Sequence, residues 1–311
     1  EHFQKKKKEI KQVYEKLYTK SPLIAGHFTY QDKGTILGHM SMLRLYDRSW
    51  MIHHHAARKT CQVKAGVAVL KQIGRFGYEG HRFQSSHMDY LLCYYRPDNL
   101  FPAFVFGGAV TAINHPQQCS EDAFAYLHVN GTTKETTPLV SPWTLEAADQ
   151  IDLSALEEHY KQVSGGMMIQ ALDLYPEFEE GTRLEKEYEQ YGFSKKKYIL
   201  ALKKSGNLKA VVLVNMTDTG LNMSDLTNSI KMMVLDSSGL DRDILMSAAG
   251  RIADTFPAGD VPLLVHPVSY AESVGLEIEK KYNLWIMKIE HSDKYFSHIN
   301  TLFKDHLKQG G

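Results

Sequence analysis

The sequence predicts an α+β fold made of two successive domains, residues 1–145 and 146–311, each with a mixed, mostly antiparallel sheet flanked by helices. One observation is an order of elements that runs through the first half and again through the second: helix, antiparallel strands, helix, strand, helix, strand. Another is a stretch rich in turn formers at 130–145, which separates the halves. In addition, 311 residues are enough for two domains that each bury a core.

The first half begins with a helix and continues with strands. Residues 3–18 carry apolar side chains three and four positions apart, as an amphipathic helix does. Strand-forming runs bounded by turn residues follow at 24–30, 36–46 and 50–57. The remaining elements predicted here are a helix at 66–76, a buried central strand at 88–95, a helix at 101–113 and a short strand at 123–129.

The second half repeats this order. It opens with a helix at 153–163, for which Asp152 is the predicted N-cap, and an apolar segment at 167–174 follows. The turn formers at 205–207 join two strands in a clear hairpin. The further elements are a helix at 183–191, strands at 198–203, 208–215, 229–235, 261–265 and 284–289, and helices at 243–256, 269–274 and 295–307.

Composition excludes several classes of function. The chain has 36 basic and 36 acidic residues, so no net charge favours nucleic acid or an anionic membrane. Its cysteines, Cys61, Cys93 and Cys119, are too few and too widely spaced for a disulfide framework, and we expect buried thiols in a reducing compartment. No apolar run approaches the ~20 residues of a membrane span and no signal-peptide pattern is present, so we expect a cytoplasmic protein without a membrane span.

The strand at 50–57 is the most informative stretch for function. It runs into three consecutive histidines, His53, His54 and His55, and a helix with Lys64 and Gly66 near its start follows. A strand that leads through a basic, glycine-containing turn into a helix is a natural anion site. Strand alternation places His53 and His55 on one face and His54 on the other.

The order of elements resembles the GNAT acyltransferase superfamily, in two tandem copies that span nearly the whole chain. In that family the strand before the main helix splays from its neighbour, and the pantetheine of acyl-CoA pairs with the exposed backbone. The pyrophosphate sits on a loop of type Arg/Gln-x-x-Gly-x-Gly/Ala. Residues 66–68, Gly-Val-Ala, match the second half of that loop, whereas Val63 stands at the Arg/Gln position. The resemblance implies acetyl-CoA or another acyl-CoA as cofactor, bound by Lys64, Gly66, Val67 and Ala68.

The second half matches the family less well. Its turn at 236–241 lacks the Gly-x-Gly/Ala pattern and carries two aspartates that would repel a pyrophosphate. Tyr270, five residues before Gly275, is similar to the family's tyrosine that protonates the departing CoA thiolate, although that tyrosine stands four residues before its glycine.

Two narrower groups also share this tandem arrangement. The chain resembles the FemX-like aminoacyl transferases, whose donor is an aminoacyl-tRNA. It more closely resembles a bacterial group in which such a region follows a PilZ-like domain. The chain begins with Glu1 in a charged helix, so we expect an upstream domain in the full-length protein. The resemblance implies that this domain binds a cyclic dinucleotide.

Acyl transfer to an amine needs a base, donors for the oxyanion and an acid for the thiolate. Histidine titrates near neutrality, so His54 or His55 is the candidate base. Core histidines bonded to neighbouring strands are the alternative interpretation of these residues. A metal site of His53, His55, His87 and Asp89 is a third possibility, without supporting ligand spacing.

Substrate contacts are predicted at two places. Arg96, at the end of the buried strand, suits a substrate carboxylate or phosphate. In the polar loop at 215–228, Asp218, Asn222 and Asp225 suit a substrate amine, and an ordinary structured loop is the alternative.

The leading hypothesis is acyl-CoA-dependent N-acyl transfer to a small-molecule amine or a peptide. One alternative is a FemX-like transferase with an aminoacyl-tRNA donor, which would need a basic groove that the neutral charge does not favour. The other is a non-catalytic ligand-binding or signalling module with degenerate GNAT domains.

Overall fold

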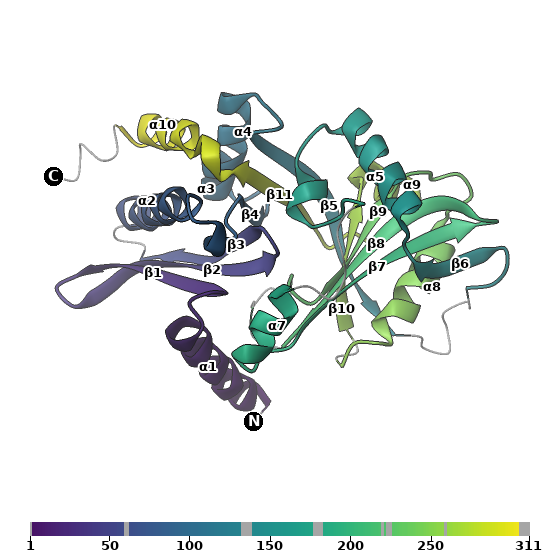
Figure 1. Cartoon of the computed structure of the whole chain (residues 1–311), viewed down its shortest axis with the longest axis horizontal. Coiled ribbons are helices and arrows are strands. Elements are labelled where there is room, and N and C mark those ends of the chain that lie inside the picture. Colours follow the sequence, from purple (N-terminus) through teal and green to yellow (C-terminus); the bar gives the residue numbers. More distant parts are fainter. Residues whose placement is uncertain are drawn as a thin grey trace. The chain divides into compact units, whose positions relative to one another are not determined.

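The computed structural model describes residues 2–58, 62–131, 139–176, 183–218, 221, 226–257 and 260–304. It confirms the predicted fold class, α+β with mixed, mostly antiparallel strands flanked by helices (Figure 1). Two strand pairs are parallel, β3 with β4 and β9 with β10, and the other recorded registers are antiparallel.

The chain divides into two compact units. Unit 1 consists of residues 1–121, 166–172 and 284–311, and unit 2 of residues 122–165 and 173–283. The last strand and helix of the chain therefore complete unit 1, and the units do not coincide with the two halves of the sequence. The boundary expected between residues 145 and 146 stays a prediction about separately folding domains.

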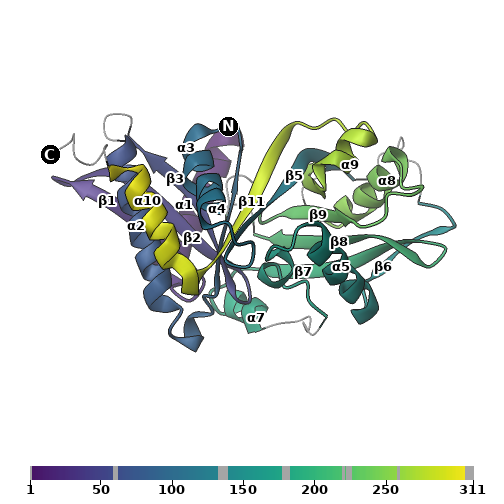
Figure 2. The same ribbon diagram turned by 90° about the horizontal axis from the view of Figure 1, so that it is seen from above.

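Unit 1 has the strand order β1-β2-β3-β4-β11. Helix α2 covers one face of β1–β3, and α1 lies against the other face (Figure 1). Helix α10 runs beside α2 (Figure 2). The elements of unit 1 are α1 (His2–Lys20), β1 (Ala25–Asp32), β2 (Thr35–Tyr46), β3 (Ser49–Ala57), α2 (Gln62–Gly80), η2 (Gln84–Ser86), β4 (Tyr90–Tyr95), α3 (Leu100–Pro102), η3 (Ala103–Gly107), α4 (Gly108–Ile113), α6 (Met168–Ala171), η4 (Ile289–His291) and α10 (Ser292–Leu302).

Strands β5 (Cys119–Asn130) and β11 (Lys280–Lys288) each pass from one unit into the other. The core of unit 1 gathers apolar side chains from its strands and from α2, η3, α4 and α10, with Trp285 of β11 fully buried among them. This apolar burial is the main force that holds the helices on the sheet.

Unit 2 has the strand order β5-β10-β9-β8-β7-β6. Its main core lies between this sheet and helices α8 and α9, and Figure 2 shows α5 on the opposite side of the sheet. The elements are β6 (Trp143–Ala147), α5 (Gln150–Val163), α7 (Arg183–Gln190), β7 (Lys195–Lys204), β8 (Asn207–Thr217), β9 (Ser229–Val234), α8 (Arg242–Ala253), β10 (Asp260–His266) and α9 (Val268–Ser273).

Three local predictions were wrong. Strand β6 begins inside the expected linker and extends two residues past its end, because pairing with β7 overrides the turn-forming neighbours. The N-cap of α5 is Asp149, and Asp152 is the third helical residue, which closes a reciprocal capping box. The helix expected at 101–113 is interrupted by the five-residue π-helical segment η3, just before the second of two consecutive glycines.

Candidate functional site

The parallel pair β3 and β4 opens toward the C-terminal ends of its strands. The two strands pair over only three positions, residues 49–51 with residues 90–92. Strand β3 then continues for six residues and β4 for three without a further recorded pair between them. The recorded pairing between the two strands therefore covers only their first residues, and the strands separate beyond it.

A bulge interrupts β3 within this open segment. Ser41 pairs with His53, but His39 pairs with Ala56, so His54 and His55 together lie opposite Met40. His54 has a φ of 55°, in the left-handed region that residues other than glycine seldom adopt. Bulges of this kind re-aim side chains and are common next to active sites.

The bulge changes which way the histidines point. The rings of His53 and His54 lie next to each other with centroids 4.0 Å apart and planes tilted by 41°, and both rings bond tyrosines of α1. The Tyr14 hydroxyl lies 3.0 Å from Nδ1 of His54, and the Tyr18 hydroxyl lies 3.3 Å from Nε2 of His53. The predicted alternation, with His53 and His55 on one face, is therefore wrong, because the bulge inserts an extra residue into the strand.

His55 points to the start of α2 instead. Its ring packs on Phe101 with centroids 5.2 Å apart. A Cβ on Gly66 would lie 3.2 Å from Nε2 of His55 and 3.4 Å from Cζ of Phe101. Glycine therefore allows the first turns of α2 to approach the bulge closely. Nε2 of His55 is buried without a hydrogen-bond partner among the described residues.

Burial keeps both candidate bases neutral. It lowers the pKa of His54 to about 4, helped by the nearby imidazoles of His39 and His27. Burial likewise lowers the pKa of His55 to about 4. At neutral pH both imidazoles can accept a proton, but they are weak bases.

The predicted cofactor residues occupy the first two turns of α2. The side chain of Lys64 is exposed, Val67 is buried in the core of unit 1, and Ala68 is half-buried. The structure thus brings Gly66 next to His55 and leaves Lys64 open to solvent near the helix start. The turn residues 59–61, including Cys61, lie outside the described part of the chain.

Arg96 follows the last residue of β4. Its Nε lies 3.0 Å from Oδ1 of Asp98, and one of its terminal nitrogens bonds the other carboxylate oxygen. Both side chains are about half exposed. A substrate carboxylate would have to compete with Asp98 for this guanidinium.

Tyr95 and Glu121 form a polar pair that local sequence patterns do not indicate. The Tyr95 hydroxyl, at the open end of β4, donates to Oε2 of Glu121 over 2.5 Å. Both residues belong to unit 1. Their separation of 26 positions carries no sequence signal, so only the fold reveals this proton-transfer candidate.

The corresponding region of unit 2 is closed. Its parallel strands pair over residues 230–233 and 263–266, which leaves one residue of β9 and none of β10 beyond the last pair. The N-terminus of α8 is already capped by a carboxylate of the chain itself, because the Asp241 side chain accepts a hydrogen bond from the Ile244 N–H. Asp236 in the same turn bonds Lys209 and Ser238.

Tyr270 lies in unit 2, in α9, and is 5% exposed. Its hydroxyl donates to the Leu240 carbonyl over 3.0 Å, and burial raises its pKa. The hydroxyl therefore makes a hydrogen bond within unit 2, whereas His54 and His55, the candidate bases, belong to unit 1.

The predicted amine contacts are only partly described. Asp218 follows the last residue of β8 and accepts a hydrogen bond of 2.6 Å from the N–H of Ser194, the residue before β7, so it links the ends of these two strands within unit 2. Asn222 and Asp225 lie outside the described residues.

The alternative metal site does not form. His87 lies near Asp47, with 3.9 Å between Nδ1 and Oδ1, and Asp89 bonds Arg48. Within the described ranges, no three His, Cys, Asp or Glu side chains gather as metal ligands would. Burial raises the pKa of Cys93 well above its usual range and that of Cys119 to about 12, as expected for unreactive thiols. No described helix is long and apolar enough to cross a membrane.

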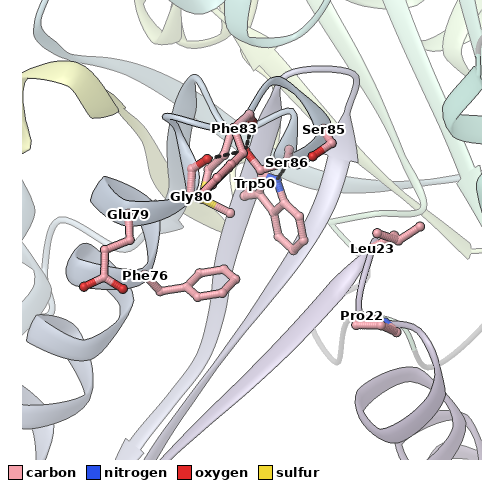
Figure 3. Close-up of a pocket in the computed structure, with 10 residues that line it drawn as sticks. Pro22, Leu23, Trp50, Phe76, Glu79, Gly80, Phe83, Ser85 and Ser86 are labelled. Atoms are coloured by element: carbon pink, nitrogen blue, oxygen red, sulfur yellow. Dashed lines mark hydrogen bonds between the residues drawn. The ribbon is translucent and has the colours of Figure 1, made fainter.

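A separate pocket of about 380 Å³ lies near the C-terminal end of α2. Figure 3 shows the rings of Trp50 and Phe76 on one side and Leu23 with Pro22 on the other. The indole N–H of Trp50 donates a hydrogen bond of 3.1 Å to the Ser86 carbonyl. The pocket walls are thus mainly apolar, and none of the predicted site residues lines them.

Comparison with known proteins gives only distant similarities. The sequence matches no protein-family model, and no curated protein is significantly similar to it. A GCN5-related N-acetyltransferase from Sphaerobacter thermophilus is 12% identical, with a TM-score of 0.41, over 91% of this chain and 85% of that one. A tandem GNAT protein from the clavulanic acid pathway is 10% identical (TM-score 0.37; 85% and 83% covered). The N-myristoyltransferase of Saccharomyces cerevisiae with bound myristoyl-CoA is 11% identical (TM-score 0.36; 82% and 68% covered). At these scores the function has to be inferred from the chain's own geometry.

Proposed function

We propose that the protein is an acyl-CoA-dependent N-acyltransferase whose donor binds unit 1 between the separated ends of β3 and β4. The observation that carries the proposal is the short parallel pairing of these strands beside a bulge, followed directly by helix α2. This is the arrangement in which the GNAT superfamily, which the sequence resembles, binds acyl-CoA.

Each part of the donor has a matching feature. We propose that the amide groups of a pantetheine arm pair with backbone groups of β3 beyond its contact with β4, as a strand added to a sheet does. The pyrophosphate would lie at the start of α2, where the helix N–H groups and the Lys64 ammonium favour negative charge. Gly66 would let the backbone approach the phosphates, and Val67 and Ala68 continue the turn.

Proton transfer remains the least defined step. His54 and His55 are the predicted bases, and their lowered pKa keeps them neutral at pH 7. Tyr95 with Glu121 is the additional candidate at the open end of β4. The nucleophilic amine of the acceptor must lose a proton, and the thiolate of CoA must gain one. We propose that these groups, and not Tyr270, serve the donor in unit 1.

Titration calorimetry with acetyl-, succinyl- and longer acyl-CoA tests the proposal. We expect heat of binding for at least one donor, a roughly tenfold or greater loss of affinity in Lys64→Glu, and a smaller change in the control Lys71→Glu on the same helix. His54→Ala and His55→Ala should lower turnover more than affinity. The absence of both heat and thermal stabilisation with every donor would contradict the proposal.

A non-catalytic binding module is the second candidate function. Three features of unit 2 favour it: the parallel strands β9 and β10 do not separate, Asp241 caps helix α8, and the Tyr270 hydroxyl bonds the Leu240 carbonyl. Binding of acyl-CoA without release of CoA in the presence of amines or peptides would select this alternative.

The remaining predictions concern partners. We propose a small-molecule amine or a peptide as acceptor, with Arg96 and Asp218 as candidate contacts. A cyclic-dinucleotide-binding upstream domain and a cytoplasmic location stay predictions. No structural observation favours an aminoacyl-tRNA donor.

A further inference from the structure

The apolar pocket at the C-terminal end of α2 has the properties of a second ligand site. Its volume of about 380 Å³ lies within the range of small-molecule sites, which are mainly apolar and carry a few polar groups. It is bounded by the segment after α1, the start of β3, the last turn of α2 and the segment that leads to β4, all of which belong to unit 1. None of the residues that line it belongs to the proposed donor site, which lies at the other ends of β3 and β4.

Three aromatic rings, those of Trp50, Phe76 and Phe83, line this pocket. The rings of Trp50 and Phe76 stand nearly perpendicular, with an angle of 77° between their planes and centroids 6.5 Å apart. The indole N–H already bonds the Ser86 carbonyl, so the indole offers a ligand its ring and not its polar group. Phe76 is 40% exposed and Phe83 is 67% exposed. A bound apolar group would therefore remove aromatic surface from water.

The backbone that carries Phe83 is fastened to the end of α2. The Phe83 N–H donates to the Gly80 carbonyl and the Ser86 N–H donates to the Phe83 carbonyl, each over 2.9 Å. The Ser86 hydroxyl lies 2.7 Å from both of these carbonyl oxygens. This wall of the pocket is thus in place before a ligand arrives, which lowers the entropy cost of binding.

The charge at the pocket is negative. Among the described residues that line it, Glu79 is the only charged one. Glu79 stands three positions after Phe76, so the two side chains share one face of α2, as Figure 3 also shows. No described side chain forms a hydrogen bond or an ion pair with the Glu79 carboxylate. The C-terminal end of α2 adds the partial negative charge of a helix terminus, and its last turn contains no basic residue.

The basic residues nearest in sequence do not neutralise this charge from inside the pocket. Arg75 and Arg82 are absent from its lining. The guanidinium of Arg82 lies over the Tyr78 ring, 4.9 Å from its centroid, and donates to the Tyr78 hydroxyl over 2.9 Å. Two successive positions of a helix span about 200°, so Tyr78 points away from the face of Phe76.

We propose that this pocket binds a small molecule that carries an alkylated ammonium group on an apolar body. The faces of aromatic rings attract cations, most strongly where water is excluded. The methyl groups of an alkylated ammonium also bury apolar surface against the rings, and Glu79 with the end of α2 attracts the positive charge. The site does not depend on whether the protein transfers acyl groups.

Titration calorimetry of the intact chain at constant ionic strength tests the proposal with three benzyl compounds of different charge. We expect benzyltrimethylammonium to bind about tenfold more tightly than the uncharged benzyl alcohol, and the anion phenylacetate to bind most weakly. Equal affinities for the three compounds, a preference for phenylacetate, or no binding of benzyltrimethylammonium would overturn the proposal.

Two variants place the probe in the pocket. Phe83→Ala should weaken the binding of benzyltrimethylammonium by about fivefold or more, because one ring is lost. Glu79→Gln should reduce the preference for the ammonium compound over benzyl alcohol and leave the affinity for benzyl alcohol unchanged. The matched controls are Phe104→Ala, at a phenylalanine that is 58% exposed outside the pocket, and Glu15→Gln, at an exposed glutamate of α1. Both controls should bind like the wild type.

The replaced side chains are exposed, so we expect both variants to fold, and thermal denaturation checks this. Wild-type affinity for benzyltrimethylammonium in Phe83→Ala would show that the probe binds elsewhere and would overturn the proposal. If Phe83→Ala does not fold, Glu79→Gln decides alone, because an unchanged preference between the two compounds in that variant contradicts the proposed role of the charge.

Discussion

Lys231 has an unusual position for a cationic side chain. It lies in β9 with no exposed surface, and its Nζ is 2.7 Å from the Ser229 hydroxyl and 3.4 Å from the Leu226 carbonyl. Burial, and then the charge of Lys195, lowers its pKa to about 7. Between this value and 10.5 the unfolded chain binds the proton more tightly than the native one. The free energy of unfolding therefore rises with pH across that window.

We predict that unit 2 gains about 2 kcal/mol of stability between pH 7.5 and 9.5 from this lysine, since each pH unit contributes at most about 1.4 kcal/mol. Lys231→Met should lose this slope and be as stable as the wild type or more stable near pH 7.5. Urea denaturation at the two pH values measures both quantities. An identical pH dependence in Lys231→Met would show that the gain comes from other groups.

Asp122 is a buried carboxylate supported by two hydroxyls. It accepts from Tyr160 over 2.6 Å and from Ser164 over 2.9 Å, all within unit 2. Tyr160→Phe leaves this acceptor one donor short, and we expect a loss of about 1–3 kcal/mol in the free energy of unfolding. The control Tyr198→Phe changes a hydroxyl on a side chain that is 42% exposed and should cost less than about 0.5 kcal/mol. Equal effects of the two variants would contradict this interpretation.

At the scale of elements, the packing of α10 on α2 depends on glycine. A Cβ on Gly74 would lie 2.4 Å from Cζ of Phe296 in α10, closer than real contacts allow. A Cβ on Gly77 would meet Ile289 and Leu91 at 3.5 Å, which is ordinary contact. Figure 2 shows the two helices side by side.

The two glycines therefore predict opposite outcomes on one helix. Gly74→Ala should lower the free energy of unfolding by about 1–3 kcal/mol, because α10 or the Phe296 ring must move. Gly77→Ala should be neutral or stabilising by up to about 1 kcal/mol, because alanine favours the helix. Thermal denaturation of both variants gives the comparison. Stabilisation by Gly74→Ala would mean that α10 is not packed as described.

The bulge in β3 marks the limit of prediction at this scale. The strand, the following helix and the close approach of Gly66 all have sequence signals: a strand-forming run, an apolar period and a glycine. The left-handed φ of His54 has no sequence signal, because a run of histidines without a glycine gives no reason to expect a departure from the regular alternation of a strand. For the same reason the tyrosines of α1 were not recognised as partners of His53 and His54, although their spacing of four residues places them on one helix face.

At the scale of the whole molecule, the pairing of segments far apart in the chain could not be predicted from the sequence. Local patterns identified most helices and strands, since periodicity and turn residues act over short distances. They could not place β11 and α10 in unit 1, because that choice depends on contacts between residues far apart in the chain. The pair of Tyr95 and Glu121, on β4 and β5, was missed for the same reason.

The two units differ in the opening of their parallel strands, and this predicts where a donor binds. Acetyl-CoA should slow hydrogen exchange in peptides from the C-terminal half of β3, from the start of α2 and from the end of β4. Peptides from β9 and α8 should be unaffected, because the strands of unit 2 pair to their ends and Asp241 already caps α8. Lys64→Glu should reduce the protection in unit 1, since it reverses the charge near the phosphates. Protection confined to β9 and α8 would show that the donor binds unit 2. The histidine bulge would then lie outside the donor site, because the opening of β3 from β4 would have no part in binding.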